Sequence, residues 1–220
     1  RLQRRPNTID VDWAEWFQEV LGAIDAAGLE VWVALHEASV PRWFDDEGGS
    51  GDADALVRWW PRWVERVADR FGDRIHGWIP FASMSPGTPA EPWPFQAWKD
   101  TWGILGGSGG TVVAALDVRR DALDTFQFVE RHLGLTDRIG VDLTELLARV
   151  RPATAGGTAD QLAERASEAV GGAIREVADS AGSTPLTVTA IPTGAGVGQA
   201  SDDDGPLLEI AVAAVDEAVA

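Results

Sequence analysis

Short apolar runs alternate with helix-type patterns along this 220-residue chain, and this alternation limits the folds open to it. Five runs predict strands: 29–35, 75–81, 111–118, 138–143 and 185–191. The first run is almost entirely apolar and suits a strand buried on both faces. Helical spacing of apolar residues predicts helices over 11–27, 54–70, 95–105, 121–133, 161–181 and 206–220. Strands that alternate with helices predict an α/β fold with a parallel sheet, either doubly wound or part of a barrel.

Charge and composition exclude several classes of partner. The formal net charge is -17, so the surface repels nucleic acid and anionic lipid, and neither is an expected partner. The chain has no cysteine, which excludes disulfides and thiolate chemistry. No apolar run approaches the roughly 20 residues of a membrane span. No leader peptide is visible either, and the expected location is the cytoplasm.

Several motifs, in order and at matching spacing, resemble the family 1 glycoside hydrolases, the β-glucosidase family. They include Leu35 to Pro41, Gly48-Gly49, Phe71 to Ile75 with Trp78, Asp137 to Val141, and Pro185 to Thr189. The resemblance implies a (β/α)8 TIM barrel of which the sequence holds only about strands three to seven. It also implies a single domain over 1–220, incomplete at both ends. Residues 106–110 (Gly-Gly-Ser-Gly-Gly) form either a natural loop or an inserted linker.

The resemblance fails at the catalytic positions. Family members are retaining enzymes that use two carboxylates about 5 Å apart, one as acid/base and one as nucleophile. Their positions are occupied by Ser83 and Ala190. No Asp or Glu lies between Asp179 and Asp202, so a shifted alignment does not restore the strand-seven nucleophile. The sugar-binding His-Trp pair of the family is replaced by Glu37-Ala38.

Other polar residues near the expected strand ends form the candidate ligand-binding set: His36, Glu37, Asp117, Asp142 and Glu145. A relocated carboxylate pair, such as Glu37 with Asp142, could run hydrolysis, and His36, Glu37, Asp117 and Asp142 could hold a metal. The competing interpretation is that these residues are helix caps, loop residues and a satisfied histidine. We favour the competing interpretation, and so expect no metal and no cofactor.

The sequence therefore favours a pseudo-glycosidase, a barrel protein without catalysis that binds or scaffolds. The alternatives are an active hydrolase with relocated carboxylates and a trimmed or engineered barrel fragment. Expected partners are a carbohydrate or a protein, and a second chain that completes the barrel. The eleven tryptophans fit either core packing, which we favour, or stacking against sugar rings.

Overall fold

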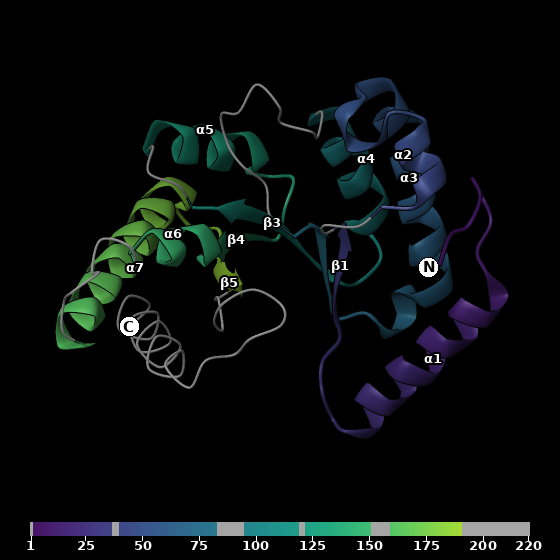
Figure 1. Ribbon diagram of the computed structural model, residues 1–220, viewed down its shortest axis with the longest axis horizontal. Coiled ribbons are helices and arrows are strands. Elements are labelled where there is room, and N and C mark those ends of the chain that lie inside the picture. The colour runs from purple at the N-terminus through teal and green to yellow at the C-terminus, as the bar shows by residue number, and fades with distance from the viewer. Residues whose placement is uncertain (1, 37–39, 83–94, 119–121, 151–158, 191–220) are drawn as a thin grey trace. The chain divides into compact units, whose positions relative to one another are not determined.

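Helices and strands alternate along the chain in the predicted order, as Figure 1 shows. The computed structural model describes residues 2–36, 40–82, 95–118, 122–150 and 159–190. These residues fall into two compact units. The first takes its residues from 1–82, 88–114 and 134–138, and the second from 83–87, 115–133 and 139–220.

The first unit holds the N-terminal helices and the first strands. Helix α1 spans Val11–Ala26, and Asp10 caps it by accepting a hydrogen bond from the Trp13 backbone. Strand β1 (Trp32–His36) leads to the short helix α2 (Arg42–Asp46) and the 3-10 turn η1 (Gly49–Gly51). The long helix α3 (Ala53–Phe71) runs through Pro61 and is followed by η2 (Gly72–Arg74) and strand β2 (Gly77–Phe81). Helix α4 (Phe95–Leu105) precedes strand β3 (Thr111–Asp117), whose first residues belong to this unit.

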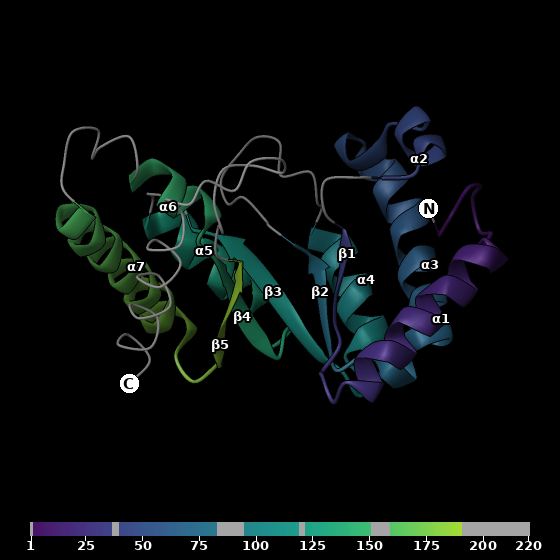
Figure 2. The ribbon, with the colours of Figure 1, turned by 60° about the horizontal axis from the view of Figure 1, so that its bottom comes forward.

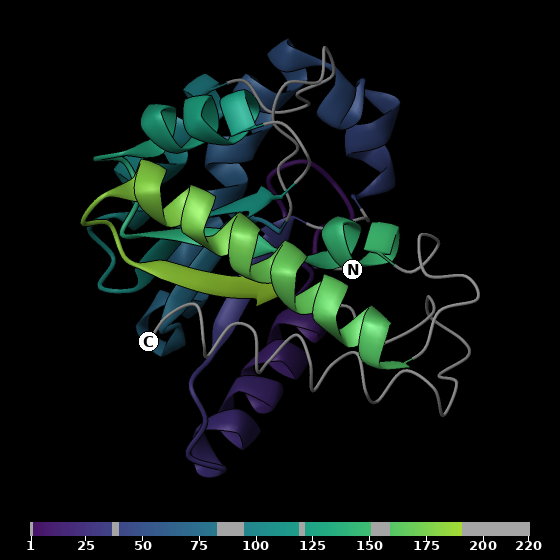
Figure 3. The ribbon, with the colours of Figure 1, turned by 90° about the vertical axis from the view of Figure 1, so that its left-hand side faces the viewer.

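The second unit begins in β3 and holds the remaining elements. Helix α5 spans Ala122–His132, strand β4 Arg138–Asp142 and helix α6 Thr144–Val150. Helix α7 (Ala159–Ala181) turns at Gly182 into strand β5 (Leu186–Ala190). Figure 3 shows the two running in opposite directions, as a helix and the next parallel strand do.

The five strands form one sheet in the order β1-β2-β3-β4-β5. The β1/β2, β2/β3 and β4/β5 ladders are parallel, and Figure 2 shows β1, β2 and β3 side by side. Neighbours in sequence are thus neighbours in the sheet, which is the order of strands in a barrel rather than in a doubly wound sheet. The predicted parallel α/β fold is confirmed. The helix predicted over 206–220 lies outside the described residues.

Each unit has an apolar core of its own. In the first unit, α3 buries Leu56 and Val64, and the ring of Trp60 stacks on Phe81 of β2 at a centroid distance of 4.8 Å. In the second unit, α5 and α7 bury Val129, Val170 and Val177 together with Ile139 and Val141 of β4. These positions follow the helical and strand periods that predicted the elements.

The prediction that β1 is buried on both faces is wrong. Trp32 is 40% exposed, and no residue of the strand is fully buried. The physical reason is that β1 ends the sheet of the described strands and therefore has a neighbouring strand on one side only. Helix α1 is also more exposed than its apolar period suggests. Its aromatic residues Trp13, Trp16 and Phe17 contact one another and remain exposed to solvent.

The glycine-rich segment 106–110 forms the turn between α4 and β3. Gly109 has a φ of +85°, which favours glycine. A Cβ at Gly110 would lie 2.8 Å from Nε1 of Trp78, which is too close for a side chain. Within the described part of the chain, no helix is long and apolar enough to cross a membrane.

Candidate functional site

His36 is the last residue of β1 and belongs to the first unit. Its imidazole packs against Trp60 and Phe81 at centroid distances of 6.3 Å and 6.4 Å. Burial lowers the pKa of His36 from its ordinary value of 6.5 to about 4, and a hydrogen bond with its own backbone opposes the shift. The ring is therefore neutral near pH 7. Glu37, the next member of the predicted set, lies outside the described residues.

Asp117 and Asp142 are the last residues of β3 and β4, and both are buried. The structure brings these strand ends together, because the Val118 backbone donates to the carbonyl of Asp142 at 3.2 Å. The Asp142 carboxylate also accepts a hydrogen bond at 2.9 Å from the backbone of Thr144, the first residue of α6.

Glu145 does not join these two aspartates in a buried group. Its side chain is half exposed on α6 and lies 4.0 Å from Arg149, one turn further along the helix. Such exposed pairs contribute little to stability or chemistry. Among the described residues, no group of three or more His, Cys, Asp or Glu side chains is placed to hold a metal ion.

Of the two family positions for catalytic glutamates, one falls in the described residues. Ala190 ends β5, and the ladder pairs it with Asp142 of β4 next to a local irregularity in the register. Ser83 lies outside the described residues. Position 190 is thus at the carboxyl end of a parallel strand, where barrel enzymes carry their catalytic groups.

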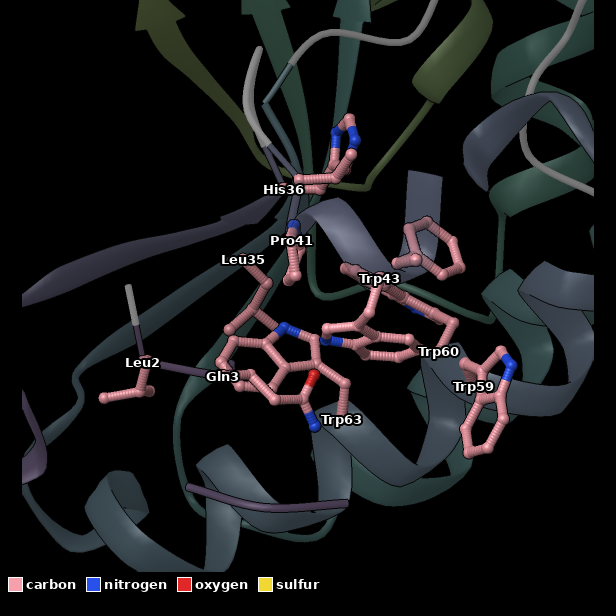
Figure 4. Close-up of a pocket in the computed structure, with 11 residues that line it drawn as sticks. Leu2, Gln3, Leu35, His36, Pro41, Trp43, Trp59, Trp60 and Trp63 are labelled. Carbon is pink, nitrogen blue, oxygen red and sulfur yellow. The ribbon is translucent and has the colours of Figure 1, made fainter. Parts of the chain in front are cut away.

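The described residues contain a cavity of about 220 Å³, and it belongs to the first unit. Figure 4 shows its lining, which comes from the N-terminal segment, the end of β1, α2 and α3. Aromatic side chains dominate that lining: Trp43, Phe44, Trp59, Trp60 and Trp63. Leu2, Gln3, Leu35, His36, Val40 and Pro41 complete it.

Hydrogen bonds fix two of the indoles. Trp60 donates its Nε1–H to Oγ1 of Thr101 at 2.8 Å, and Trp59 donates to the carboxylate of Glu47. The ring of Trp43 meets Trp59 edge to face at 5.4 Å. Because these rings are held by protein partners, the aromatic walls are largely preformed.

Among the described members of the predicted set, His36 alone lines the cavity. Residue-by-residue reasoning on the sequence missed Gln3, Trp43, Trp59 and Trp63. The available signal was the density of tryptophan around α2 and α3, which we had assigned to the core. The structure buries Trp60, Trp78 and Trp98 and leaves Trp43, Trp59 and Trp63 partly accessible.

Comparison with known proteins places the fold. No protein-family model matches the sequence. Among solved structures, the chain is similar to the AHE enzyme of Alicyclobacillus herbarius, with a TM-score of 0.62 and 13% identity over 99% of this chain and 67% of that one. It is also similar to the family 1 β-glucosidase of Thermotoga maritima in complex with isofagomine lactam, with a TM-score of 0.63 and 10% identity over 96% and 66% of the two chains. The same organism's family 1 glycoside hydrolase with a cyclophellitol analogue gives 0.66 and 9% over the same shares.

These similarities confirm the predicted class of fold. The chain has the fold of part of a TIM-barrel glycosidase, with its five parallel strands in sequential order. It spans about two thirds of the length of the solved structures it matches. At such low identity the likeness concerns the fold, and function has to be argued from the residues of this chain.

Proposed function

We propose that this chain is a pseudo-glycosidase, a protein of glycosidase-like fold that binds or scaffolds without hydrolysing glycosides. The observation that carries the proposal is position 190. It ends β5, where the related family keeps its nucleophile, and the sequence has no carboxylate from 180 to 201. An alanine has no group that can attack an anomeric carbon, so the covalent route of a retaining enzyme is absent. Serine at position 83 supports the proposal, because a hydroxyl does not protonate a leaving glycoside near neutral pH.

A second candidate function is an active hydrolase with relocated carboxylates. The observation in its favour is that Asp117 and Asp142 are both buried at neighbouring strand ends. Against it stands the hydrogen bond from the Thr144 backbone, which already engages one oxygen of the Asp142 carboxylate. We therefore rank this function second.

Hydrolysis of aryl glycosides by the purified full chain separates the two functions. We expect no release of the aryl alcohol above that of a heat-denatured sample. Turnover that falls in both Asp117→Asn and Asp142→Asn, but not in the surface variant Glu145→Gln, would contradict the pseudo-glycosidase proposal. It would instead assign the chemistry to the relocated aspartates.

The proposed partners are a carbohydrate or protein ligand and the remaining part of a barrel. Exposed aromatic residues on α1 and the end-strand position of β1 support the second partner, because such surfaces favour association. That part of the barrel would come from further residues of the same protein or from another chain. Light scattering on the purified chain tests this proposal: self-association should increase with concentration, and Trp16→Ser should reduce it.

A further inference from the structure

Three tryptophans of the first unit keep part of their ring surface accessible at one cavity. Trp43 of α2 and Trp59 and Trp63 of α3 line the cavity of about 220 Å³ and are partly accessible, whereas Trp60 in the same lining is buried. Figure 4 shows the indoles of Trp43, Trp60 and Trp63 close together, with Trp59 beside them. The rings of Trp43 and Trp59 are almost perpendicular, at an interplanar angle of 80°. Aromatic walls at such angles present ring faces and edges to a ligand from more than one side.

The electrostatics of this cavity favour a cation. The face of an indole ring is negative, and the described lining includes no Lys or Arg that would repel a cation. The imidazole of His36 does not repel one either, because burial lowers its pKa to about 4 and leaves the ring neutral near pH 7. Glu37, the next residue in the sequence, adds a negative charge to this stretch. An anion would be repelled both by the ring faces and by the net charge of -17.

Trp59 already attracts a cation of the protein itself. The guanidinium carbon of Arg62 lies 5.3 Å from the centre of the Trp59 ring, which is a cation–π contact. The indole N–H of the same ring donates to the carboxylate of Glu47. Because a hydrogen bond to a carboxylate polarises its donor, it makes this ring a better partner for positive charge. Asp45 and Glu47 also add negative charge next to the lining residues of α2.

Size and hydrogen bonding define the kind of cation. A cavity of roughly 150 Å³ holds benzene, so about 220 Å³ admits a trimethylammonium group with a short substituent. A primary ammonium or a guanidinium carries N–H donors that need acceptors, and Gln3 and His36 are the only side chains of the described lining that can accept. A quaternary ammonium has no N–H donor, so it leaves no buried donor unpaired in an aromatic cavity.

We propose that this cavity binds a small quaternary ammonium compound of the size of choline. Its methyl groups contact the rings of Trp43, Trp59 and Trp63, and its positive charge is attracted by these rings. The inference goes beyond the pseudo-glycosidase proposal and does not depend on it, because the described lining includes neither position 83 nor position 190.

Calorimetric titration of the purified full chain with choline tests the site. The matched neutral probe is the alcohol in which a tert-butyl group replaces the trimethylammonium group of choline, because it keeps the shape and loses the charge. We expect saturable binding of choline, and binding of the neutral alcohol that is weaker by about ten-fold or more. Trp43→Leu and Trp63→Leu should each weaken choline binding about ten-fold, because each removes an aromatic ring and keeps an apolar side chain. Trp16→Leu makes the same change on the exposed surface of α1, and this control should bind choline like the wild type.

Each other outcome overturns the proposal. Absence of choline binding contradicts the site, and binding of the neutral alcohol as tight as that of choline contradicts the ligand class. Choline binding that survives both Trp43→Leu and Trp63→Leu, or that falls equally in Trp16→Leu, contradicts the location. Circular dichroism shows whether each variant is folded, and if one variant fails to fold the other decides. The comparison of choline with the neutral alcohol needs no variant, so it tests the ligand class in any case.

Discussion

His132 should make the folded state sensitive to mild acid. It is the last residue of α5 and only 5% exposed, its ring stacks on Phe128 at 4.2 Å, and its Nδ1–H donates to the Phe128 carbonyl at 2.7 Å. Burial lowers the pKa of His132 from 6.5 to about 4, with the charge of Arg131 acting in the same direction and the hydrogen bond opposing it.

The size of the effect follows from linkage. The unfolded chain binds a proton on His132 near pH 6.5, and the folded chain does so only near pH 4. The contribution of the neutral histidine is therefore fully present above pH 6.5 and is lost as the pH falls toward 4. At 1.36 kcal/mol per pKa unit the full loss is about 3 kcal/mol, of which about 2 kcal/mol falls between pH 7 and pH 5.

Urea unfolding followed by tryptophan fluorescence at pH 7 and pH 5 measures this loss. His132→Gln removes the titrating group, so its free energy of unfolding should fall about 2 kcal/mol less between the two pH values than that of the wild type. Leu133→Gln is the control, because it changes an exposed side chain in the same turn and keeps His132. Equal losses in the wild type and in His132→Gln would refute the reasoning, since the remaining pH dependence is common to both.

Four further predictions use the same unfolding measurement. His36→Gln should also reduce the loss on acidification, because burial lowers the pKa of His36 to about 4, and an unchanged pH dependence would contradict this. Leu56→Ala should lower the free energy of unfolding by about 2–5 kcal/mol, because Leu56 is fully buried. Val57→Ala, at a position 42% exposed, should change it by no more than about 0.5 kcal/mol. Similar losses in the two variants would count against the described core. Gly103→Ala in α4 should stabilise the fold by about 0.5–1 kcal/mol, because a Cβ there meets no atom within 4 Å. Gly28→Ala should destabilise the fold by about 1 kcal/mol, because the φ of Gly28 is +71°. The reverse order of stability would contradict the backbone description. Asp52→Ala should lower the free energy of unfolding by about 1 kcal/mol, because the Asp52 carboxylate accepts hydrogen bonds from the backbones of Asp54 and Ala55 at the start of α3. Asp52→Asn should retain most of that stability, because its amide oxygen can accept the same bonds. An equal loss in both variants would contradict the capping role.

Local sequence patterns determined the order of the elements. The cap at Asp10, the left-handed glycine at 28 and the helical period of α3 act within a few residues of one another, so they can be interpreted without knowing the fold. The short helices α2 and α6 were missed, because five to seven residues give too little periodicity to recognise. The loss of the family's catalytic carboxylates at positions 83 and 190 was also visible in the sequence, since it concerns which residue is present.

Tertiary structure alone decided what covers each apolar face. Periodicity identifies an apolar stripe, but burial depends on partners distant in the sequence, which is why α1 and β1 are more exposed than predicted and His132 is buried. The cavity shows the same limit. Gln3, Trp43 and Trp63 come from three separate segments, and no local pattern predicts that their side chains face one space. The sequence thus determined the elements and the missing carboxylates, whereas long-range packing decided the candidate binding site.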